Sequence, residues 1–382
     1  MPPPVLTLRD LNRATLARQG LIVPLPAMSV ARRIERLGSL QAQHPDWPPF
    51  ALATRLPPGQ TADLYAARVR RSVVRATLMR LTVHVVSAAD FWPMSTLTLE
   101  FRRNQFRALY KQDPVTSPIG RQMASTLPAV RAAMRERPLA IREIEAIMAA
   151  GLQGVDIPPR RSLWRFVSGA LPLVLVPFRK EAYGRARYVE AEEWIGPPSA
   201  EQADRQRAEE LFAERYLAAF GPAGPDDIAA YLDRGRAGRR WREVVDRLGD
   251  RVRHFVDENG RPLVDLVRAP RPGGETPAPP RLLARWDSLL LAYGTADRTR
   301  VLPDQYRSAV ITNNADVLPT FLVDGFVAGT WLPRLAAGGN PDIELRPFGR
   351  LPASVRSALE DEAQRVLPTL RAGAFSRYPG TD

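Results

Sequence analysis

One order of elements recurs along this chain and limits its fold more than any other sequence feature: short amphipathic helices followed by a pair of strands. Caps, helical spacing of apolar residues and proline stops predict three helices near the start of the chain, at 7–20, 29–41 and 47–56. A fourth predicted helix, 62–76, precedes a strand-like stretch at 77–87. A helix-turn-helix followed by strands is the winged-helix pattern.

The same order recurs twice further along the chain. Helices are predicted at 139–149 and 162–168, ahead of a hairpin over 171–194. Two more short helices precede a hairpin over 252–267, whose Asn259-Gly260 turn is a strong short-range hairpin signal. The sequence therefore predicts three helix-turn-helix units in tandem, each followed by a wing.

A proline- and glycine-rich stretch, 269–280, separates these units from a strand-rich C-terminal part. That part contains a predicted hairpin at Asp324-Gly325, a strand at 342–348 and a final helix over about 353–371. The fold class is therefore α+β, mainly helical, with tandem winged-helix units and a C-terminal β-rich domain. The expected domains are 1–110, 111–200, 201–280 and 281–382.

Composition excludes several classes of site. The chain has no cysteine, which rules out disulfides, thiolate zinc sites and thiol catalysis. Its three histidines, His44, His84 and His254, are scattered, so we expect no metal and no cofactor. No apolar run approaches the ~18 residues of a membrane span, and the N-terminus lacks a basic region and a long apolar run. We expect a cytoplasmic protein without a membrane partner.

The charge balance indicates the kind of partner. The formal net charge is +13, and arginine supplies all but two of the 54 basic residues. An excess of this size favours a polyanionic partner, most often nucleic acid. GC-rich codons would also favour arginine over lysine, and the alternative is a basic surface that serves only solubility.

Arginines cluster around the first wing and around the third helix-turn-helix, where they would suit phosphate contacts that fix register on a duplex. Around the first wing they are Arg68, Arg70, Arg71, Arg75 and Arg80; around the third helix-turn-helix they are Arg234, Arg236, Arg239, Arg240 and Arg242. Further along, Asp287 and Asp297 flank an apolar run near Arg298 and Arg300, so one carboxylate could tether an arginine while another arginine reaches phosphate. The alternatives are solvated faces and plain surface ion pairs.

Two glutamines interrupt the apolar stripe of the second predicted helix. Val30, Ile34 and Leu37 recur at helical spacing, and Gln41 is the next member of that stripe. Because Gly38 weakens the turn before it and Pro45 disfavours helix after it, we expect the helix to release here. On extended backbone Gln41 and Gln43 would then point into one space. The alternative is a helix end with two solvated amides.

Other polar side chains lie close to these elements in sequence. His44 and Asp46 border the glutamines, although a His-Pro-Asp turn could be no more than a helix stop. Arg80, Thr82 and His84 alternate along a predicted strand and would share one face. His84 could equally be a core histidine with satisfied hydrogen bonds.

These stretches resemble one known family, the winged-helix DNA glycosylases of the AlkZ and YcaQ type. Leu40-Gln41-Ala42-Gln43 is similar to its glutamine motif, and the run RATLMRLTVHVVSAAD at 75–90 is similar to its first-wing signature. The runs at 286–291, 296–300 and 318–331 resemble its other blocks, the last being the most specific. The resemblance covers about residues 7–335.

The resemblance implies a basic groove for duplex DNA, a C-terminal barrel-like domain and excision of cationic N-alkylated purines such as N7-alkylguanine, in the AlkZ branch also unhooking of interstrand crosslinks. Its Gln-x-Gln motif is matched by Gln41 and Gln43 as catalytic residues. The YcaQ branch has an aspartate at the second position, so Gln43 places this chain nearer AlkZ. Leu81 stands where a glycine is usual, and the segment 292–295 is longer than typical.

An amide cannot act as a general base near neutral pH, so the substrate must bring its own activation, as a cationic alkylpurine does. The glutamines would then position water, with His44, Asp46, Thr82 and His84 as possible supporting residues. No lysine lies in these motifs, so we expect a monofunctional enzyme, acting as a monomer on double-stranded DNA in the nucleoid. The alternatives are a non-catalytic winged-helix regulator and an RNA-binding protein.

Overall fold

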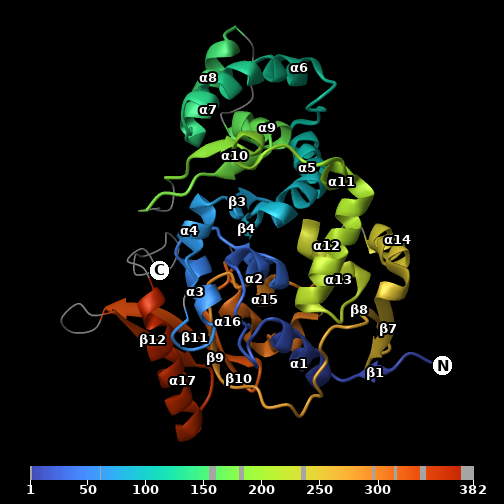
Figure 1. Ribbon diagram of the computed structural model, residues 1–382, viewed down its shortest axis with the longest axis vertical. Helices are drawn as coiled ribbons and strands as arrows, with labels where there is room; N and C mark the ends of the chain where they lie inside the picture. The colour runs from blue at the N-terminus through green and yellow to red at the C-terminus, as the bar shows by residue number, and fades with distance from the viewer. Residues whose placement is uncertain are drawn as a thin grey trace. The chain divides into compact units, whose positions relative to one another are not determined.

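The computed structural model describes residues 2–60, 62–154, 161–179, 185–233, 238–294, 297–313, 316–335 and 341–370 (Figure 1). The chain forms two compact units. The terminal unit combines residues 1–64 with 213–382, and the central unit comprises residues 65–212. The division into four domains expected from the sequence stays a prediction.

The terminal unit begins with three helices where the sequence predicts them. These are α1 (Leu8–Arg18), α2 (Val30–Arg36) and α3 (Trp47–Ala53). Thr7 and Asp10 form a reciprocal capping box at the start of α1, and Ser29 caps α2. Helix α2 ends five residues earlier than the periodicity of its apolar residues suggests.

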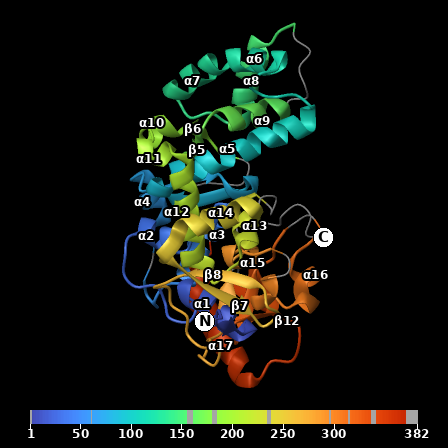
Figure 2. The ribbon, with the colours of Figure 1, turned by 90° about the vertical axis from the view of Figure 1, so that its right-hand side faces the viewer.

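The same unit contains a helical pair followed by a hairpin. Helices α13 (Pro225–Asp233) and α14 (Gly238–Leu248) precede strands β7 (Val252–Asp257) and β8 (Pro262–Leu266), which pair antiparallel as predicted (Figure 2). Strand β1 (Val5–Leu6) adds to β7 in parallel. Helix α12 (Arg205–Phe220) leads into this part of the chain from the central unit.

The C-terminal sheet is open, which corrects the expectation of a barrel-like domain. Its strand order is β12-β11-β10-β9, with all neighbours antiparallel. Among the described residues the outer strands β9 and β12 do not pair with each other, because β9 is only three residues long and helix α17 lies against it. The strands are β9 (Arg281–Leu283), β10 (Thr320–Val323), β11 (Phe326–Leu335) and β12 (Pro341–Pro347); the helices around them are α15 (Ser288–Leu291), α16 (Arg307–Val310) and α17 (Ala353–Val366).

In the central unit a sheet in the order β4-β3-β5-β6 packs with helices around a core that includes Phe106, Phe166 and Val167. The strands are β3 (Val73–Thr77), β4 (Val83–Ser87), β5 (Leu173–Leu175) and β6 (Tyr188–Glu190). The helices are α4 (Leu64–Val69), α5 (Ala88–Tyr110), α6 (Pro118–Ser125), α7 (Leu127–Glu136), α8 (Ile141–Gly151), α9 (Arg161–Ala170), α10 (Ala191–Ile195) and α11 (Ala200–Ala203).

One boundary in the central unit differs from the prediction. The expected helix over 62–76 stops at Val69, and strand β3 already begins at Val73. Arg71 has φ +60, which a right-handed helix cannot contain, and the β-branched Val73 and Val74 that follow favour a strand. The single predicted strand-like stretch is therefore the end of one hairpin strand and the whole of the next.

No helix in the described part of the chain is long and apolar enough to cross a membrane.

Candidate functional site

The backbone leaves helical geometry before it reaches the two glutamines. Helix α2 ends at Arg36, and Gly38 has φ +80, the left-handed conformation that commonly ends a helix. A Cβ at Gly38 would lie 3.1 Å from both the Ala219 Cβ and the Phe220 ring. The chain then enters the short strand β2 (Leu40–Gln41). The predicted release from helix is confirmed, and it occurs earlier than expected.

Side-chain burial alternates along the glutamine motif. Gln41 and Gln43 are half-buried, whereas Ala42 is 0% and His44 is 4% exposed. Alternation with a period of two is what extended backbone produces, because successive side chains point to opposite sides. Gln41 and Gln43 thus fall in the same, intermediate range of exposure.

Ser39, two positions before Gln41, is held by hydrogen bonds to both its side chain and its backbone. The Ser39 hydroxyl lies 2.6 Å from the Tyr231 hydroxyl, which comes from α13. The Ser39 carbonyl accepts a hydrogen bond of 3.1 Å from the Ser288 hydroxyl of α15. Ser39 and Ser288 are both buried. Two distant parts of the terminal unit therefore hold the residue that leads into the motif.

His44 and Asp46 form a buried turn directly after the glutamines. The His44 Nδ1 lies 3.4 Å from both the backbone N and the Oδ2 of Asp46, and both side chains are about 5% exposed. The next residue, Trp47, begins α3 and packs edge-on against Trp331 of β11 with ring centroids 5.7 Å apart. This turn therefore anchors the far end of the motif in the aromatic core of the terminal unit.

His84 belongs to the central unit and is completely buried. Burial, reinforced by the charge of Arg80, lowers the pKa of His84 to about 3, so the ring is neutral near pH 7. Its Nδ1 lies 2.9 Å from the Thr82 carbonyl oxygen, and its Nε2 lies 3.4 Å from the Arg80 Nη2. A neutral ring that donates from Nδ1 and accepts at Nε2 satisfies both contacts, so His84 orients Arg80.

The loop between β3 and β4 contains two strained residues. Arg80 and Leu81 have φ values of +53 and +58. A left-handed backbone conformation costs a non-glycine residue roughly 1–2 kcal/mol. This geometry gives the physical reason why a glycine suits the position that Leu81 occupies.

Three of the arginines predicted to contact DNA, Arg68, Arg75 and Arg300, are buried. Arg68 donates from Nη2 to the Leu175 carbonyl (3.1 Å), and Arg300 donates from Nη1 to the Pro222 carbonyl (2.7 Å). The Arg300 guanidinium also lies 4.2 Å from the centre of the Tyr293 ring. Because Arg68 is 6% and Arg300 is 1% exposed, both side chains contribute to the packing of the fold.

The other predicted arginines differ in their exposure. Arg71 is exposed and lies 4.5 Å above the Trp194 ring, and the Arg239 side chain is 93% exposed. Arg240 and Arg298 are half-buried, and burial, with the nearby charge of Arg307, lowers the pKa of Arg298. Arg236 lies outside the described residues.

The two aspartates of the C-terminal part tether arginines other than those expected. Asp287 binds Arg55 through two hydrogen bonds of 2.7 and 3.1 Å. Asp297 pairs with Arg261, which also binds Asp227 at 2.9 Å. These pairs stabilise the terminal unit and leave the neighbouring Arg298 to other contacts.

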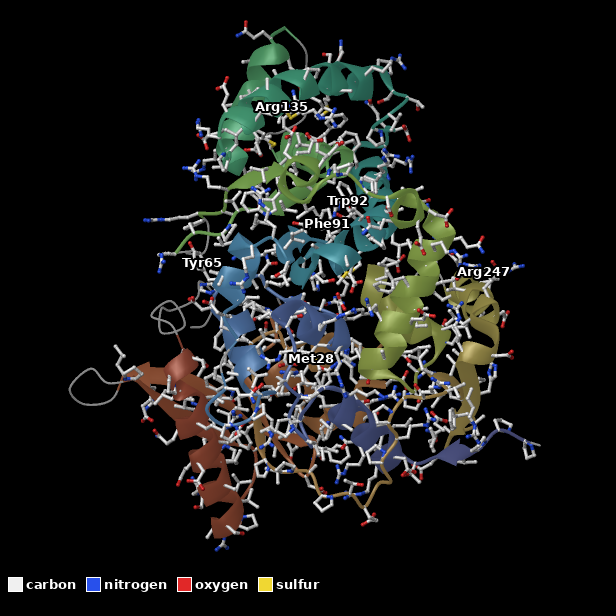
Figure 3. All side chains as sticks on the ribbon, in the orientation of Figure 1. Met28, Tyr65, Phe91, Trp92, Arg135 and Arg247 are labelled. Carbon is white, nitrogen blue, oxygen red and sulfur yellow. The ribbon has the colours of Figure 1, made fainter. Side chains whose placement is uncertain are left out.

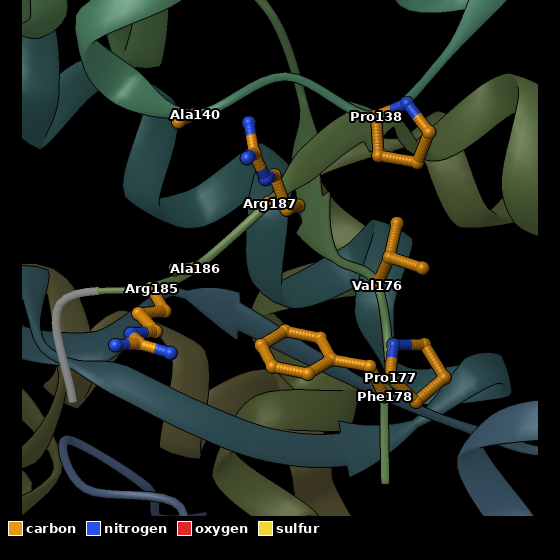
Figure 4. A pocket seen from close by; sticks show the side chains of 8 residues that line it. All are labelled: Pro138, Ala140, Val176, Pro177, Phe178, Arg185, Ala186 and Arg187. Carbon is orange, nitrogen blue, oxygen red and sulfur yellow. The ribbon is translucent and has the colours of Figure 1, made fainter. Parts of the chain in front are cut away.

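A cavity of about 690 Å³ in the central unit has basic residues that the sequence analysis did not single out. Figure 4 shows Arg185 and Arg187 on the segment that leads into β6, opposite Val176, Pro177 and Phe178 on the segment that follows β5. Arg187 also pairs with Glu143. The alternation of arginines at 185 and 187 was the available signal, because residues two apart on extended backbone point to the same side.

Basic side chains are not confined to the predicted clusters. Figure 3 labels Arg135 and Arg247, both exposed, on two different units. Arg135 pairs with Glu193 at 3.2 Å. Within the residues that the structure describes, no group of three or more histidine, aspartate or glutamate side chains could hold a metal ion.

Comparison with known proteins identifies a family. The family model described as "DNA glycosylase AlkZ-like" matches residues 34–368. The structure is similar to that of Streptomyces sahachiroi DNA glycosylase AlkZ, with a TM-score of 0.74 and 21% sequence identity over 98% of this chain and 99% of that chain. No curated protein sequence matches. The structural likeness, at this identity, shows a shared fold.

Proposed function

Because this chain belongs to the AlkZ-like DNA glycosylase family and is a DNA glycosylase, we propose that it hydrolyses the N-glycosidic bond of cationic N-alkylated purines in duplex DNA. The observation that carries this proposal is the Gln41–Gln43 motif. It lies inside the matched range and outside helix, with Gln41 in strand β2, both glutamines half-buried and the preceding Ser39 fixed by two hydrogen bonds.

The proposed chemistry needs no strong base from the protein. A purine alkylated at N7 leaves with the bonding electron pair of the glycosidic bond and so becomes neutral. The sugar passes through an oxocarbenium-like state, water adds to C1′, and the surplus proton goes to solvent. A primary amide offers both donors and an acceptor, so the two glutamine amides can orient that water and stabilise the charged sugar.

Preorganisation is what the surrounding residues contribute. A water held for attack must stay in place while charge develops on the sugar, which requires the amides themselves to be fixed. Gly38 and Ser39 on one side, and the His44–Asp46 turn on the other, hold the backbone of the motif. His44 and Asp46 are thus positioning residues in this proposal, not bases.

DNA binding is assigned to exposed arginines. Arg71 and Arg239 are exposed, and half-buried Arg80, Arg240 and Arg298 are further candidates for phosphate contacts. The helical pairs followed by hairpins support a tandem winged-helix arrangement on a basic face. We include in the proposal that the enzyme is monofunctional, acts as a monomer on nucleoid DNA, and has an open site that accepts bulky or crosslinked bases.

A single-turnover excision assay tests the proposed function. Duplex DNA with one N7-methylguanine is incubated with excess protein, and abasic sites are then cleaved and counted. We expect excision by the wild-type protein, loss of it in Gln41→Ala/Gln43→Ala, and wild-type activity in Gln122→Ala, which removes an exposed glutamine on α6. Excision by the double variant at the wild-type rate would disprove the assignment of the glutamines.

A further inference from the structure

A second cavity, of about 150 Å³, lies in the central unit where helices α5 and α9 run side by side. Both views show this neighbourhood of the two helices (Figures 1 and 2). Arg102, Arg103 and Arg165 line the cavity together with apolar residues. Within the described chain, none of the residues that line it is acidic. Three cations therefore share a small space without a carboxylate.

Arg102 is the buried member of this group. Its Nη1 donates to the Ser168 carbonyl (2.9 Å), and its Nη2 donates to the Thr98 hydroxyl (3.2 Å) and the Thr77 carbonyl. All three acceptors are neutral, and the buried Nε has no hydrogen-bond partner in the described structure. Burial lowers the pKa of Arg102 to about 10, as expected for a charge without a counter-charge.

The other two arginines stand closer to solvent. Arg103 is half-buried and Arg165 is exposed. Among the residues that the structure describes, neither guanidinium has an ion pair with a carboxylate. The unpaired Nε of buried Arg102 and the two more exposed arginine cations form a built site for an anion, since charge-assisted hydrogen bonds would satisfy all three.

We propose that this cavity binds one phosphate group. The volume equals about five water molecules at roughly 30 Å³ each, which suits a single tetrahedral anion and is below the ~300 Å³ of a pocket for a whole drug-sized ligand. The absence of carboxylates among the described lining residues argues against a metal-bound polyphosphate. Arginine guanidinium groups match phosphate geometry better than any other side chain.

The phosphate has two possible sources with the same chemistry: the backbone of a DNA strand or a free phosphorylated molecule. The apolar walls, among them Pro114, Val115 and Leu127, would pack against the sugar that carries the phosphate in either case. The DNA source rests on the proposed function; the phosphate site itself does not. The experiment must therefore separate the two.

Gly169 of α9 allows the cavity to be filled without changing any charge. A Cβ at Gly169 would lie 3.7 Å from the Arg102 Cβ, which is an ordinary contact, so Gly169→Ala fits and is the matched control. Gly169→Leu would extend into the cavity. Arg103→Ala/Arg165→Ala, the rim variant, removes the two cavity arginines that lie closer to solvent. Arg142→Ala/Arg356→Ala, which removes two exposed arginines of α8 and α17 outside the cavity, controls for net charge.

The first arm measures calorimetric binding of inorganic phosphate at low salt. The second measures the slope of log affinity against log salt for undamaged duplex DNA. We expect at least ten-fold weaker phosphate binding in Gly169→Leu and in the rim variant, but not in the two controls. If the phosphate belongs to DNA, the slope also falls by about 0.9 in the same two variants.

Each outcome decides a point. Changes in both arms, or in the salt slope alone, support a DNA phosphate at this site. A change in phosphate binding alone supports the site but assigns it to a free phosphorylated molecule. No change in either arm, in protein that melts as the wild type does, overturns the proposal. If the wild-type protein does not excise N7-methylguanine, the proposed function is refuted. The phosphate-binding and salt-slope measurements then still test the phosphate site.

Discussion

Arg55 and Asp287 form a bidentate ion pair in which both side chains are 1% exposed. The Asp287 carboxylate also accepts a hydrogen bond of 3.0 Å from the Leu289 N–H and so caps α15. The next residue, Ser288, donates to the Ser39 carbonyl, two residues before Gln41. A single buried carboxylate thus connects the end of α3 to the residue that holds the glutamine motif.

Replacing Asp287 should destabilise the protein strongly. Asp287→Ala leaves the Arg55 charge buried without its partner, and loss of one member of a buried pair typically costs about 3–5 kcal/mol. Urea unfolding followed by circular dichroism measures the change. Glu193→Gln breaks the exposed pair with Arg135 and should cost less than about 1 kcal/mol, so equal losses in the two variants would contradict this account.

Each glutamine should contribute to the chemical step and little to binding. We expect Gln41→Ala and Gln43→Ala each to lower the single-turnover excision rate on the order of 10²-fold, about 2.7 kcal/mol. Duplex affinity should stay within a few-fold, because the amides act on charge that exists only near the transition state. The double variant should lose less than the sum of the two, since groups that hold one water act as a unit. A large loss of affinity with an unchanged rate would assign them to binding.

Because the backbone at Leu81 is left-handed, the stability of the protein should depend on which of three residues, leucine, valine or glycine, occupies position 81. Leu81→Val places a β-branched residue at φ +58 and should destabilise the protein by at least about 1 kcal/mol. Leu81→Gly removes the strain but also loses partly buried surface, so its stability should be close to that of the wild type. Urea unfolding gives the order, and a valine variant as stable as the wild type would show that the loop is not strained.

The neutral His84 should make stability depend on pH below its unfolded pKa of about 6.5. Its folded pKa is lowered to about 3, so the unfolded chain binds more protons between these values, and stability falls as the pH drops from 6.5 towards 3. At pH 5 the loss due to His84 approaches about 2 kcal/mol. His84→Gln should show a smaller loss between pH 7.5 and 5 in urea unfolding; an identical loss would attribute it to other groups.

Alanine substitutions of exposed and of buried arginines should affect different properties: the first DNA binding, the second stability. Arg239→Ala should lower the slope of log affinity against log salt by about 0.9 and leave unfolding unchanged. Arg300→Ala should lower the free energy of unfolding, because it removes a buried contact to the Pro222 carbonyl and the stacking on Tyr293. A lower salt slope in Arg300→Ala, with unchanged unfolding, would assign Arg300 to the DNA interface.

Local signals predicted local structure well. Thr7 and Asp10 form the expected helix start, and the turns at Asn259-Gly260 and Asp324-Gly325 join antiparallel strands. In both turns the glycine has a positive φ, as its residue type allows. Such features depend on a few neighbouring residues, so the sequence carries them completely.

Features that depend on distant partners were not predictable in this way. Asp287 pairs with Arg55, 232 residues away, instead of with a neighbour. Arg68 looked like a surface cation, yet a carbonyl of β5 lets it be buried. From sequence alone an arginine is predicted to be exposed. Whether its side chain is buried depends on hydrogen-bond acceptors far along the chain.

The terminal unit is built from both ends of the chain, and this has a consequence for how the enzyme is made. The ribosome completes the glutamine motif early, but Tyr231 and Ser288, which hold Ser39, emerge much later. At about 5–20 residues per second the nascent motif waits for tens of seconds before its supports exist. A prematurely terminated chain would therefore carry both glutamines without the hydrogen bonds that fix Ser39.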